Sequence, residues 1–255
     1  MRSVIGAARL FIFLLSAIFT ICYQSIVLFF TKGRFAYIYP RAYHAFLCRL
    51  FGIRIIVEGD IETEGRVVYV GNHISYLDIE VIGSVLTGSF VAKKEVESWP
   101  IFGILGKMQR TLYISRSPKD ARRETDTMLE RLEENIPLII FPEGTSSNGI
   151  NVLPFKSSFF EILLNRNIKI QPFTISVLEV DGNPVKTAAI RDQYTWYGDM
   201  TLEPHLWAFA KGEGAVVKVS LQKPVLSNEF SDRKTLSAAC HTGVVKGLDL
   251  SPAAA

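Results

Sequence analysis

The fold of this chain is predicted most directly by the stretch Val67-Val68-Tyr69-Val70-Gly71-Asn72-His73-Ile74-Ser75-Tyr76-Leu77-Asp78. Its first four residues are β-branched or aromatic, which predicts a buried strand. A glycine and an asparagine then break the run. Ser75, three residues before Asp78 and followed by apolar residues, indicates a helix start with a capping-box pattern. His73 is therefore expected between a strand's carboxyl end and a helix amino terminus, where open α/β sheets bind ligands.

The spacing of His73 and Asp78 supports two interpretations. An aspartate in the first helical turn can fold back toward the loop that carries the histidine. It would then fix the tautomer of the ring and stabilise the imidazolium, so that His73 could act as a general base. Alternatively, Asp78 only caps the helix and His73 is an ordinary turn residue, because capping boxes are common. These residues alone leave both interpretations open.

The composition is that of a globular protein with some excess of apolar residues. The chain has 255 residues, of which 48% are hydrophobic and 21% charged, enough for one large α/β domain or two small ones. The net charge of +3 is unevenly distributed, since residues 1–57 carry seven Lys or Arg and no acid, which leaves −4 for the rest. A basic, apolar amino terminus predicts a membrane-facing end. The body has no basic stripe, which argues against nucleic acid.

No metal or nucleotide cofactor is expected from the sequence. Cys22, Cys48 and Cys240 are far apart and form no Cys-x-x-Cys pair, so a disulfide framework or zinc site is not predicted and a reducing compartment is the simpler interpretation. His-Glu-x-x-His, P-loop and Gly-x-Gly-x-x-Gly motifs are absent. A hydrolase is the nearest alternative enzyme, but the sequence lacks a Gly-x-Ser-x-Gly elbow.

The amino-terminal segment is predicted to attach the chain to a membrane. Residues 10–31 contain no charge, and about 20 apolar residues cross a bilayer. The run is too long for a signal peptide and lacks a small-residue cleavage site; a re-entrant or monotopic hairpin remains open. Residues 32–54 mix five basic residues with aromatic ones, which is typical of the headgroup zone. We therefore predict residues 1–53 as a membrane anchor with a basic interfacial segment. The positive-inside rule places residues 54–250 in the cytoplasm.

Beyond the anchor, predicted strands and helices alternate. Strands are predicted at residues 55–57, 67–70, 89–92, 111–114, 138–141, 168–178 and 216–221. Helices are predicted at residues 75–86, 99–108, 118–135, 158–165 and 230–248. This alternation predicts the α/β class, with a single mixed, largely parallel sheet flanked by helices and preceded by an amino-terminal membrane-anchoring helix.

Polar residues also follow other predicted strands, as His73 does. Arg116 follows one, Glu143-Gly144-Thr145 follows another, and Lys156 comes shortly afterwards. Arginine, lysine, glycine amides and short hydroxyls are groups that bind phosphate. Each alone is more often a surface residue or a turn. Their common position after strands, beside a His–Asp pair, predicts an anion-binding site.

Four ordered motifs resemble those of glycerolipid acyltransferases of the 1-acylglycerol-3-phosphate type. They are Asn72-His73-x-x-x-x-Asp78, Tyr113-Ile114-Ser115-Arg116, Phe141-Pro142-Glu143-Gly144-Thr145 and Ile170-Gln171-Pro172-Phe173. The resemblance covers roughly residues 54–180. One departure is that Lys156 is followed by Ser157-Ser158, where the family usually has a glycine. In addition, the segment 196–200 is similar to one in bacterial members that include lyso-ornithine lipid acyltransferases.

The resemblance implies that residues 54–250 are an acyltransferase catalytic domain. The implied reaction moves an acyl group from acyl-CoA or acyl-carrier protein, as co-substrate, to lysophosphatidic acid, which gives phosphatidic acid in phospholipid biosynthesis. A lyso-ornithine lipid or another lysophospholipid is the alternative acceptor, and a membrane-anchored lipid-binding protein is the non-enzyme alternative. The implied location is the cytoplasmic face of a bacterial inner membrane.

The resemblance also assigns roles to residues. His73 would be the general base and Asp78 would orient it, without a covalent acyl-enzyme. The implied acceptor site consists of Arg116, Glu143, Gly144, Thr145 and Lys156. Glu143 would bind a glycerol hydroxyl or orient Arg116. Residues 99–108 would line an acyl chain, or form an ordinary core helix. The lining is expected from Trp99, Ile101, Phe102, Ile104, Leu105 and Met108.

Overall fold

The computed structural model describes residues 1–115, 117 and 119–248, so the predicted site residue Arg116 lies outside the described residues. Within them, nine strands form one sheet in the order β1-β8-β6-β2-β5-β3-β4, with β7 and β9 also pairing with β6. The strands are β1 (Ile53–Glu58), β2 (Val67–Gly71), β3 (Ser89–Lys93), β4 (Leu112–Ile114), β5 (Leu138–Ile140), β6 (Lys169–Val180), β7 (Asn183–Pro184), β8 (Ala215–Leu221) and β9 (Val225–Leu226).

The sheet is mixed and largely parallel, as predicted. The pairs β1–β8, β6–β2, β2–β5, β5–β3 and β3–β4 are parallel. β7, β8 and β9 run antiparallel to β6. The central strand β2 is buried along its whole length, which is why its sequence is a continuous apolar run rather than an alternating one.

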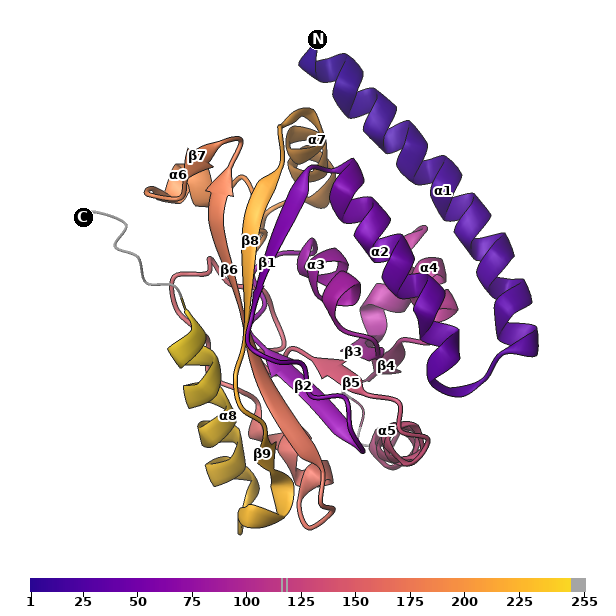
Figure 1. Ribbon diagram of the computed structural model, residues 1–255, viewed down its shortest axis with the longest axis vertical. Helices are drawn as coiled ribbons and strands as arrows, with labels where there is room; N and C mark the ends of the chain where they lie inside the picture. The colour runs from indigo at the N-terminus through magenta and orange to yellow at the C-terminus, as the bar shows by residue number, and fades with distance from the viewer. Residues whose placement is uncertain (116, 118, 249–255) are drawn as a thin grey trace.

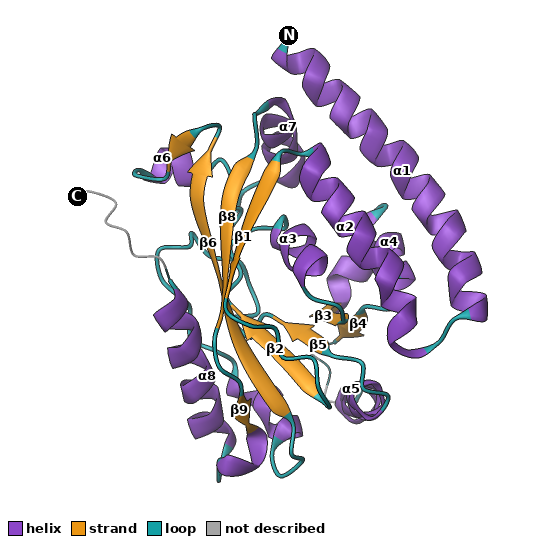
Figure 2. Ribbon diagram, viewed as in Figure 1, coloured by secondary structure: helices purple, strands orange, loops and turns teal. Residues whose placement is uncertain are grey.

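Helices cover both faces of the sheet (Figures 1 and 2). The α-helices are α1 (Arg2–Phe30), α2 (Ile38–Leu50), α3 (Asp78–Val85), α4 (Phe102–Met108), α5 (Ala121–Glu133), α6 (Ala188–Arg191), α7 (Leu202–Lys211) and α8 (Arg233–Gly247). The 3₁₀ helices are η1 (Gly33–Tyr37), η2 (Lys94–Ser98), η3 (Ser157–Leu163) and η4 (Ser227–Glu229). Tyr69 of β2 packs in the core on the α2 and α3 side, whereas Val68 and Val70 pack in the core with α5, η3 and α8.

The predicted helices differ from the structure in their first residues, and one differs in type. The helix predicted from Ser75 begins at Asp78, because the Asp78 carboxylate accepts the backbone amides of Ile74 and Ser75 and so holds these residues in the preceding loop. The helix predicted at 158–165 is the 3₁₀ helix η3. Helix α7 was not predicted as an element, since its ten residues include a proline and a histidine and carry no strong start signal.

Helix α1 lies along the rest of the chain rather than apart from it, next to α2, α4 and α7 (Figure 1). One face of the helix is buried, at Gly6, Phe13, Ala17, Thr20 and Gln24. Phe13 belongs to the same core cluster as Phe51 and Tyr69. Gly6 faces Trp207 of α7 and Arg9 donates to the carbonyl oxygens at the end of α7. The helix is also long and apolar enough to cross a membrane.

The opposite face of α1 is exposed and apolar. Its exposed large side chains are Val4, Ile5, Phe11, Ile12, Leu14, Leu15, Ile18, Phe19, Tyr23, Ile26, Phe29 and Phe30. A contiguous exposed apolar surface of this kind marks a contact with a membrane or with another protein. The predicted boundary between an anchor and a catalytic domain falls inside β1, which begins at Ile53, and stays a prediction.

The packing of α2 on α3 fixes the position of α3, which carries Asp78. A Cβ atom on Gly83 would lie 2.4 Å from the His44 ring, so glycine permits this close approach. The ring of His44 is held from both sides: Nδ1 lies 2.6 Å from Glu80 Oε2, and Nε2 lies 2.9 Å from Gln109 Oε1. Helices α2, α3 and α4 are thereby connected through one buried side chain.

Asn72 anchors the loop that carries His73. The ladder between β2 and β6 ends at Gly71 and Phe173, but the Asn72 side chain continues it. Its Nδ2 donates to the carbonyl oxygen of Ile175 at 2.9 Å, and its Oδ1 accepts from the Ile175 amide at 2.8 Å. The side-chain amide thus replaces a backbone peptide in the ladder. It satisfies two buried backbone groups where the strand turns away.

Candidate active site

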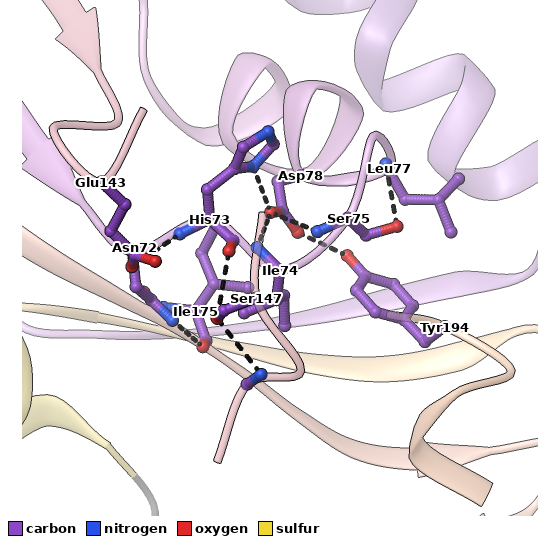
Figure 3. A network of polar contacts seen from close by, with 11 residues as sticks. Asn72, His73, Ile74, Ser75, Leu77, Asp78, Glu143, Ser147, Ile175 and Tyr194 are labelled. Atoms are coloured by element: carbon purple, nitrogen blue, oxygen red, sulfur yellow. Dashed lines mark hydrogen bonds and ion pairs between the residues drawn. The ribbon is translucent and has the colours of Figure 1, made fainter. Parts of the chain in front are cut away.

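His73 and Asp78 meet at the junction of β2 and α3 (Figure 3). His73 Nδ1 lies 2.8 Å from Asp78 Oδ2, which also accepts the backbone amides of Ile74 at 2.7 Å and Ser75 at 2.9 Å. The carboxylate is fully buried, whereas the His73 side chain is 22% exposed. Asp78 therefore holds the histidine ring and the loop before α3, whereas α3 itself has no side-chain cap.

This geometry determines the tautomer of His73. An ionised carboxylate can only accept hydrogen bonds, so Nδ1 of the ring must carry the proton. Nε2 is then the acceptor, and no hydrogen-bond partner for it occurs within the described residues. A histidine with a protonated, carboxylate-bound Nδ1 and an open, partly exposed Nε2 is suited to accept a proton from a bound hydroxyl.

The segment after β5 supports the ring and the backbone of His73. The Phe141 ring stacks on the imidazole, with centroids 4.4 Å apart and planes 17° apart. The amide of Ser147 donates to the carbonyl oxygen of His73 at 2.8 Å. The segments that follow β2 and β5 therefore meet, as predicted. Their contacts restrict rotation of the His73 ring and movement of its loop.

Glu143 lies beneath the histidine loop rather than on the surface. Its Oε1 accepts the amide of His73 at 3.2 Å, and the residue is buried. Its Oε2 has no hydrogen-bond partner among the described residues. Burial raises the pKa of Glu143 to about 8, although the backbone amides of His73 and Leu153 act in the opposite direction. Near neutral pH the carboxyl is thus largely protonated, so its free oxygen can donate a hydrogen bond.

Gly144, Thr145 and Lys156 lie together next to Glu143. The backbone of Gly144 is left-handed, with φ of +67°, and a Cβ atom there would lie 2.5 Å from Lys156 Nζ. Glycine therefore allows the ammonium group to lie over this turn. Thr145 and Lys156 are exposed. Within residues 1–115, 117 and 119–248, no carboxylate forms an ion pair with Lys156, so its charge is available to an anion.

Tyr194 is a site residue that sequence reasoning missed. Its hydroxyl donates to Asp78 Oδ1 at 3.3 Å, and the residue is fully buried. It lies 116 positions from Asp78, so no local spacing could connect the two. The only signal in the sequence was the nearby segment 196–200. Its first residue, Trp196, donates its amide to the carbonyl oxygen of Ile74 at 2.8 Å.

An apolar cavity of about 170 Å³ lies beside the site. Tyr76 and Leu77, from the loop between His73 and Asp78, form part of its lining. Four of the side chains predicted to line an acyl chain line this cavity, namely Trp99, Phe102, Leu105 and Met108. Ile101 and Ile104 do not, and Ile104 is exposed because it lies on the outer face of α4. Helices α1 and α2 also contribute to the lining, which sequence reasoning did not predict.

Comparisons with known proteins agree with this architecture. Residues 53–176 match the family model described as Acyltransferase. A lyso-ornithine lipid O-acyltransferase of Brucella abortus is 34% identical over 207 residues, which cover 78% of this chain and 77% of that protein. A 1-acyl-sn-glycerol-3-phosphate acyltransferase of Neisseria gonorrhoeae is 29% identical over 176 residues, which cover 69% of this chain and 66% of that protein.

A solved structure shares the fold. The crystal structure of the 1-acyl-sn-glycerophosphate acyltransferase PlsC from Thermotoga maritima superposes with a TM-score of 0.69 at 20% identity, covering 98% of this chain and 97% of that one. This likeness shows that the two chains share one fold, a mixed sheet flanked by helices. The chain belongs to the acyltransferase family, and it is an O-acyltransferase enzyme.

The raised pKa of Glu143 predicts a pH-dependent stability. The folded protein keeps this carboxyl protonated up to about pH 8, whereas its ordinary pKa is 4.5. Between these values the folded state binds one more proton than the unfolded state, so stability decreases as pH rises. We expect the melting temperature of the wild type to fall on the order of 5–10 °C more than that of Glu143→Gln between pH 5 and 8.5.

The measurement is thermal unfolding of the detergent-solubilised protein as a function of pH. The matched control is Glu133→Gln, at an exposed position at the end of α5, which should follow the wild-type curve. Parallel curves for the wild type and Glu143→Gln would contradict the assignment of a raised pKa.

Proposed function

We propose that this enzyme moves the acyl group of a thioester, acyl-CoA or acyl-carrier protein, to the free hydroxyl of a lysolipid in a membrane. The observation that carries the proposal is the His73–Asp78 pair, which leaves Nε2 of the ring without a partner among the described residues. Tyr76 and Leu77, from the same loop, line an apolar cavity. The pair supplies a general base, and the cavity supplies space for an acyl chain.

The reaction can be written with the residues present. The acceptor hydroxyl donates its proton to His73 Nε2 as its oxygen attacks the carbonyl carbon of the thioester. A carbon–oxygen bond forms, the carbon–sulfur bond breaks, and the proton passes from the imidazolium to the departing thiolate. Asp78 stabilises the imidazolium while it exists. The products are the acylated lipid and the free thiol.

Direct transfer fits the site better than a covalent acyl-enzyme. A nucleophilic serine, threonine or cysteine would be within hydrogen-bond reach of the base. In the described part of the chain, no such side chain hydrogen-bonds to the His73 imidazole. The hydroxyl of Ser75, the nearest in sequence, instead accepts the amide of Leu77 at 3.3 Å.

Lysophosphatidic acid is the acceptor predicted from the sequence, and the acidic end of such a lipid suits the groups beside His73. Lys156 forms no ion pair within the described residues and so offers its charge over Gly144, and Thr145 offers an exposed hydroxyl. Glu143 is buried beneath the histidine loop and supports the His73 amide from there. Arg116 remains a predicted member of this site.

Lyso-ornithine lipid is a second candidate acceptor. Its carboxylate could bind the same Lys156, and the segment 196–200, which first suggested this acceptor, contacts the histidine loop directly. The relative from Brucella abortus that is named for this substrate has greater identity and coverage than the Neisseria gonorrhoeae relative named for the glycerol phosphate. Both acceptors require the same base and the same acyl-transfer step.

We infer that α1 attaches the protein in the plane of the membrane, and the positive-inside rule predicts that the rest of the chain lies on the cytoplasmic face. A helix that crossed the bilayer alone would be surrounded by lipid, but one face of α1 is packed on the domain from Gly6 to Gln24. The apolar face opposite is free to enter the lipid. The basic residues that follow α1, Lys32 and Arg34, are exposed and suit anionic headgroups.

The first test concerns the catalytic pair. We expect His73→Ala to lower kcat by about 10²–10⁴-fold, because a positioned general base contributes that much. Asp78→Asn should lose nearly as much, since asparagine can accept the amides of Ile74 and Ser75 but cannot stabilise an imidazolium. Acyl transfer from acyl-CoA and acyl-carrier protein to each lysolipid is measured with the purified variants. If Asp78→Asn kept full turnover, the role of Asp78 would be structural and not catalytic.

The second test concerns the acceptor. We expect Lys156→Ala to raise the apparent KM for the acceptor about tenfold, because the substitution removes a charge-assisted contact. The apparent KM for the donor should stay unchanged. Lys186→Ala, at an exposed position in another loop, is the control. The kcat/KM values for lysophosphatidic acid and lyso-ornithine lipid, measured side by side, identify the acceptor. An unchanged KM for both would refute the anion role of Lys156.

The third test concerns the membrane. We expect the chain to stay with the membrane after carbonate washing. Single cysteines at Ser3 and Lys32, in a background where Cys22 is alanine, should react with an impermeant maleimide from the same, cytoplasmic side. Labelling from opposite sides would show a full span, and release by carbonate would exclude integral attachment.

A further inference from the structure

We propose that Tyr194 is a positioning residue for the catalytic pair, whose hydroxyl holds Asp78 in the orientation that presents His73 Nε2 to the acceptor. The inference rests on the acyl-transfer function proposed above. It goes beyond that function because it adds a third group to the pair, from a segment outside the four sequence motifs. Figure 3 shows Tyr194 and His73 on different sides of the Asp78 carboxylate.

The hydrogen bonds of Asp78 are divided unequally between its two oxygens. Oδ2 accepts from three donors, namely the His73 ring and the amides of Ile74 and Ser75. Oδ1 accepts from Tyr194, and no other donor to it occurs among the described residues. Without the hydroxyl, Oδ1 would be a charged, fully buried oxygen with no partner, which is costly. The carboxylate could reduce that cost only by turning, which would move Oδ2 away from His73.

Tyr194 is placed to donate at any pH at which the enzyme works. Burial holds the pKa of Tyr194 well above its ordinary value, and the nearby charge of Asp78 raises it further. The other titratable groups near it are Cys48 and Tyr76, and burial raises the pKa of each, so both are neutral. Glu143, on the far side of Asp78, is itself largely protonated near neutral pH. The hydroxyl therefore faces a single charge, the carboxylate of Asp78.

The backbone around Tyr194 is tied to the same loop as the carboxylate. The amides of Tyr194 and Thr195 donate to the carbonyl oxygen of Arg191, which fixes the turn after α6. One residue further on, the Trp196 amide donates to the carbonyl oxygen of Ile74. The segment thus contacts the loop between His73 and Asp78 through one side chain and one backbone group. Two contacts at neighbouring positions indicate a fixed support for this loop.

The test is Tyr194→Phe, which removes only the hydroxyl and keeps the ring that packs edge-on against Phe209. We expect kcat to fall about tenfold, as for loss of one hydrogen bond to a charged group. KM for donor and acceptor should be nearly unchanged. When Oδ2 turns away from the ring, Asp78 stabilises the imidazolium less, so the acid limb of the kcat/KM profile should move to lower pH. A purely structural role would not move this limb.

A double-mutant cycle separates positioning from packing. In the Asp78→Asn background, Tyr194→Phe should cause little further loss, because the group that it positions is already altered. The control is Tyr69→Phe, whose hydroxyl donates to the carbonyl oxygen of Glu62, outside the catalytic pair. This control should keep wild-type kcat and pH profile.

A rescue variant keeps the test informative if Tyr194→Phe folds poorly. Replacing Tyr194 by 4-aminophenylalanine restores a donor at the same position and should recover most of kcat. The proposal would be overturned by any of three results. These are full kcat with an unchanged pH profile in Tyr194→Phe, a multiplicative loss of kcat when Tyr194→Phe is added to Asp78→Asn, and no recovery of kcat with 4-aminophenylalanine. If His73→Ala and Asp78→Asn keep their activity, the proposed function itself fails, which is a different result.

Discussion

A single buried carboxylate organises the site. Asp78 is fully buried and accepts four hydrogen bonds, from two backbone amides, the imidazole of His73 and the hydroxyl of Tyr194. A buried charge is tolerated only where donors surround it. The need to satisfy this charge therefore determines the shape of the loop, the first residue of α3 and the orientation of the histidine together.

The sheet provides the fixed frame for this loop. Asn72 ties one end of it to β6, and Ser147, beyond the end of β5, ties the His73 carbonyl oxygen. Glu143 reaches the His73 amide from the same direction. Side chains and amides that follow neighbouring strands thus meet at one edge of the sheet, as expected for an open α/β fold. The candidate site is thus built on loops that hydrogen bonds fix to the ends of the strands.

Sequence reasoning was most successful where the signal is local. The strand 67–70 and the spacing of His73 and Asp78 were readable because each depends on neighbours within a few residues. The predicted start of α3 at Ser75 is three residues too early, because the Asp78 carboxylate accepts the amides of Ile74 and Ser75 and holds both residues in the loop. Tyr194 was not predictable, because its contact with Asp78 spans 116 positions. The packed face of α1 was not predictable either, because its contacts come from several elements, including α2 and the distant end of α7. Predicted substrate contacts at Lys156 and Arg116 await measurement.

The packed face of α1 has a consequence for how this enzyme can be handled. Phe13, Thr20 and Gln24 of α1 form part of the wall of the apolar cavity, together with Tyr43 and Leu47 of α2. The helix with the exposed apolar face is thus also one wall of the apolar cavity. Trimming the amino terminus to obtain a water-soluble chain would open that cavity to solvent and uncover the aromatic core beneath the helix.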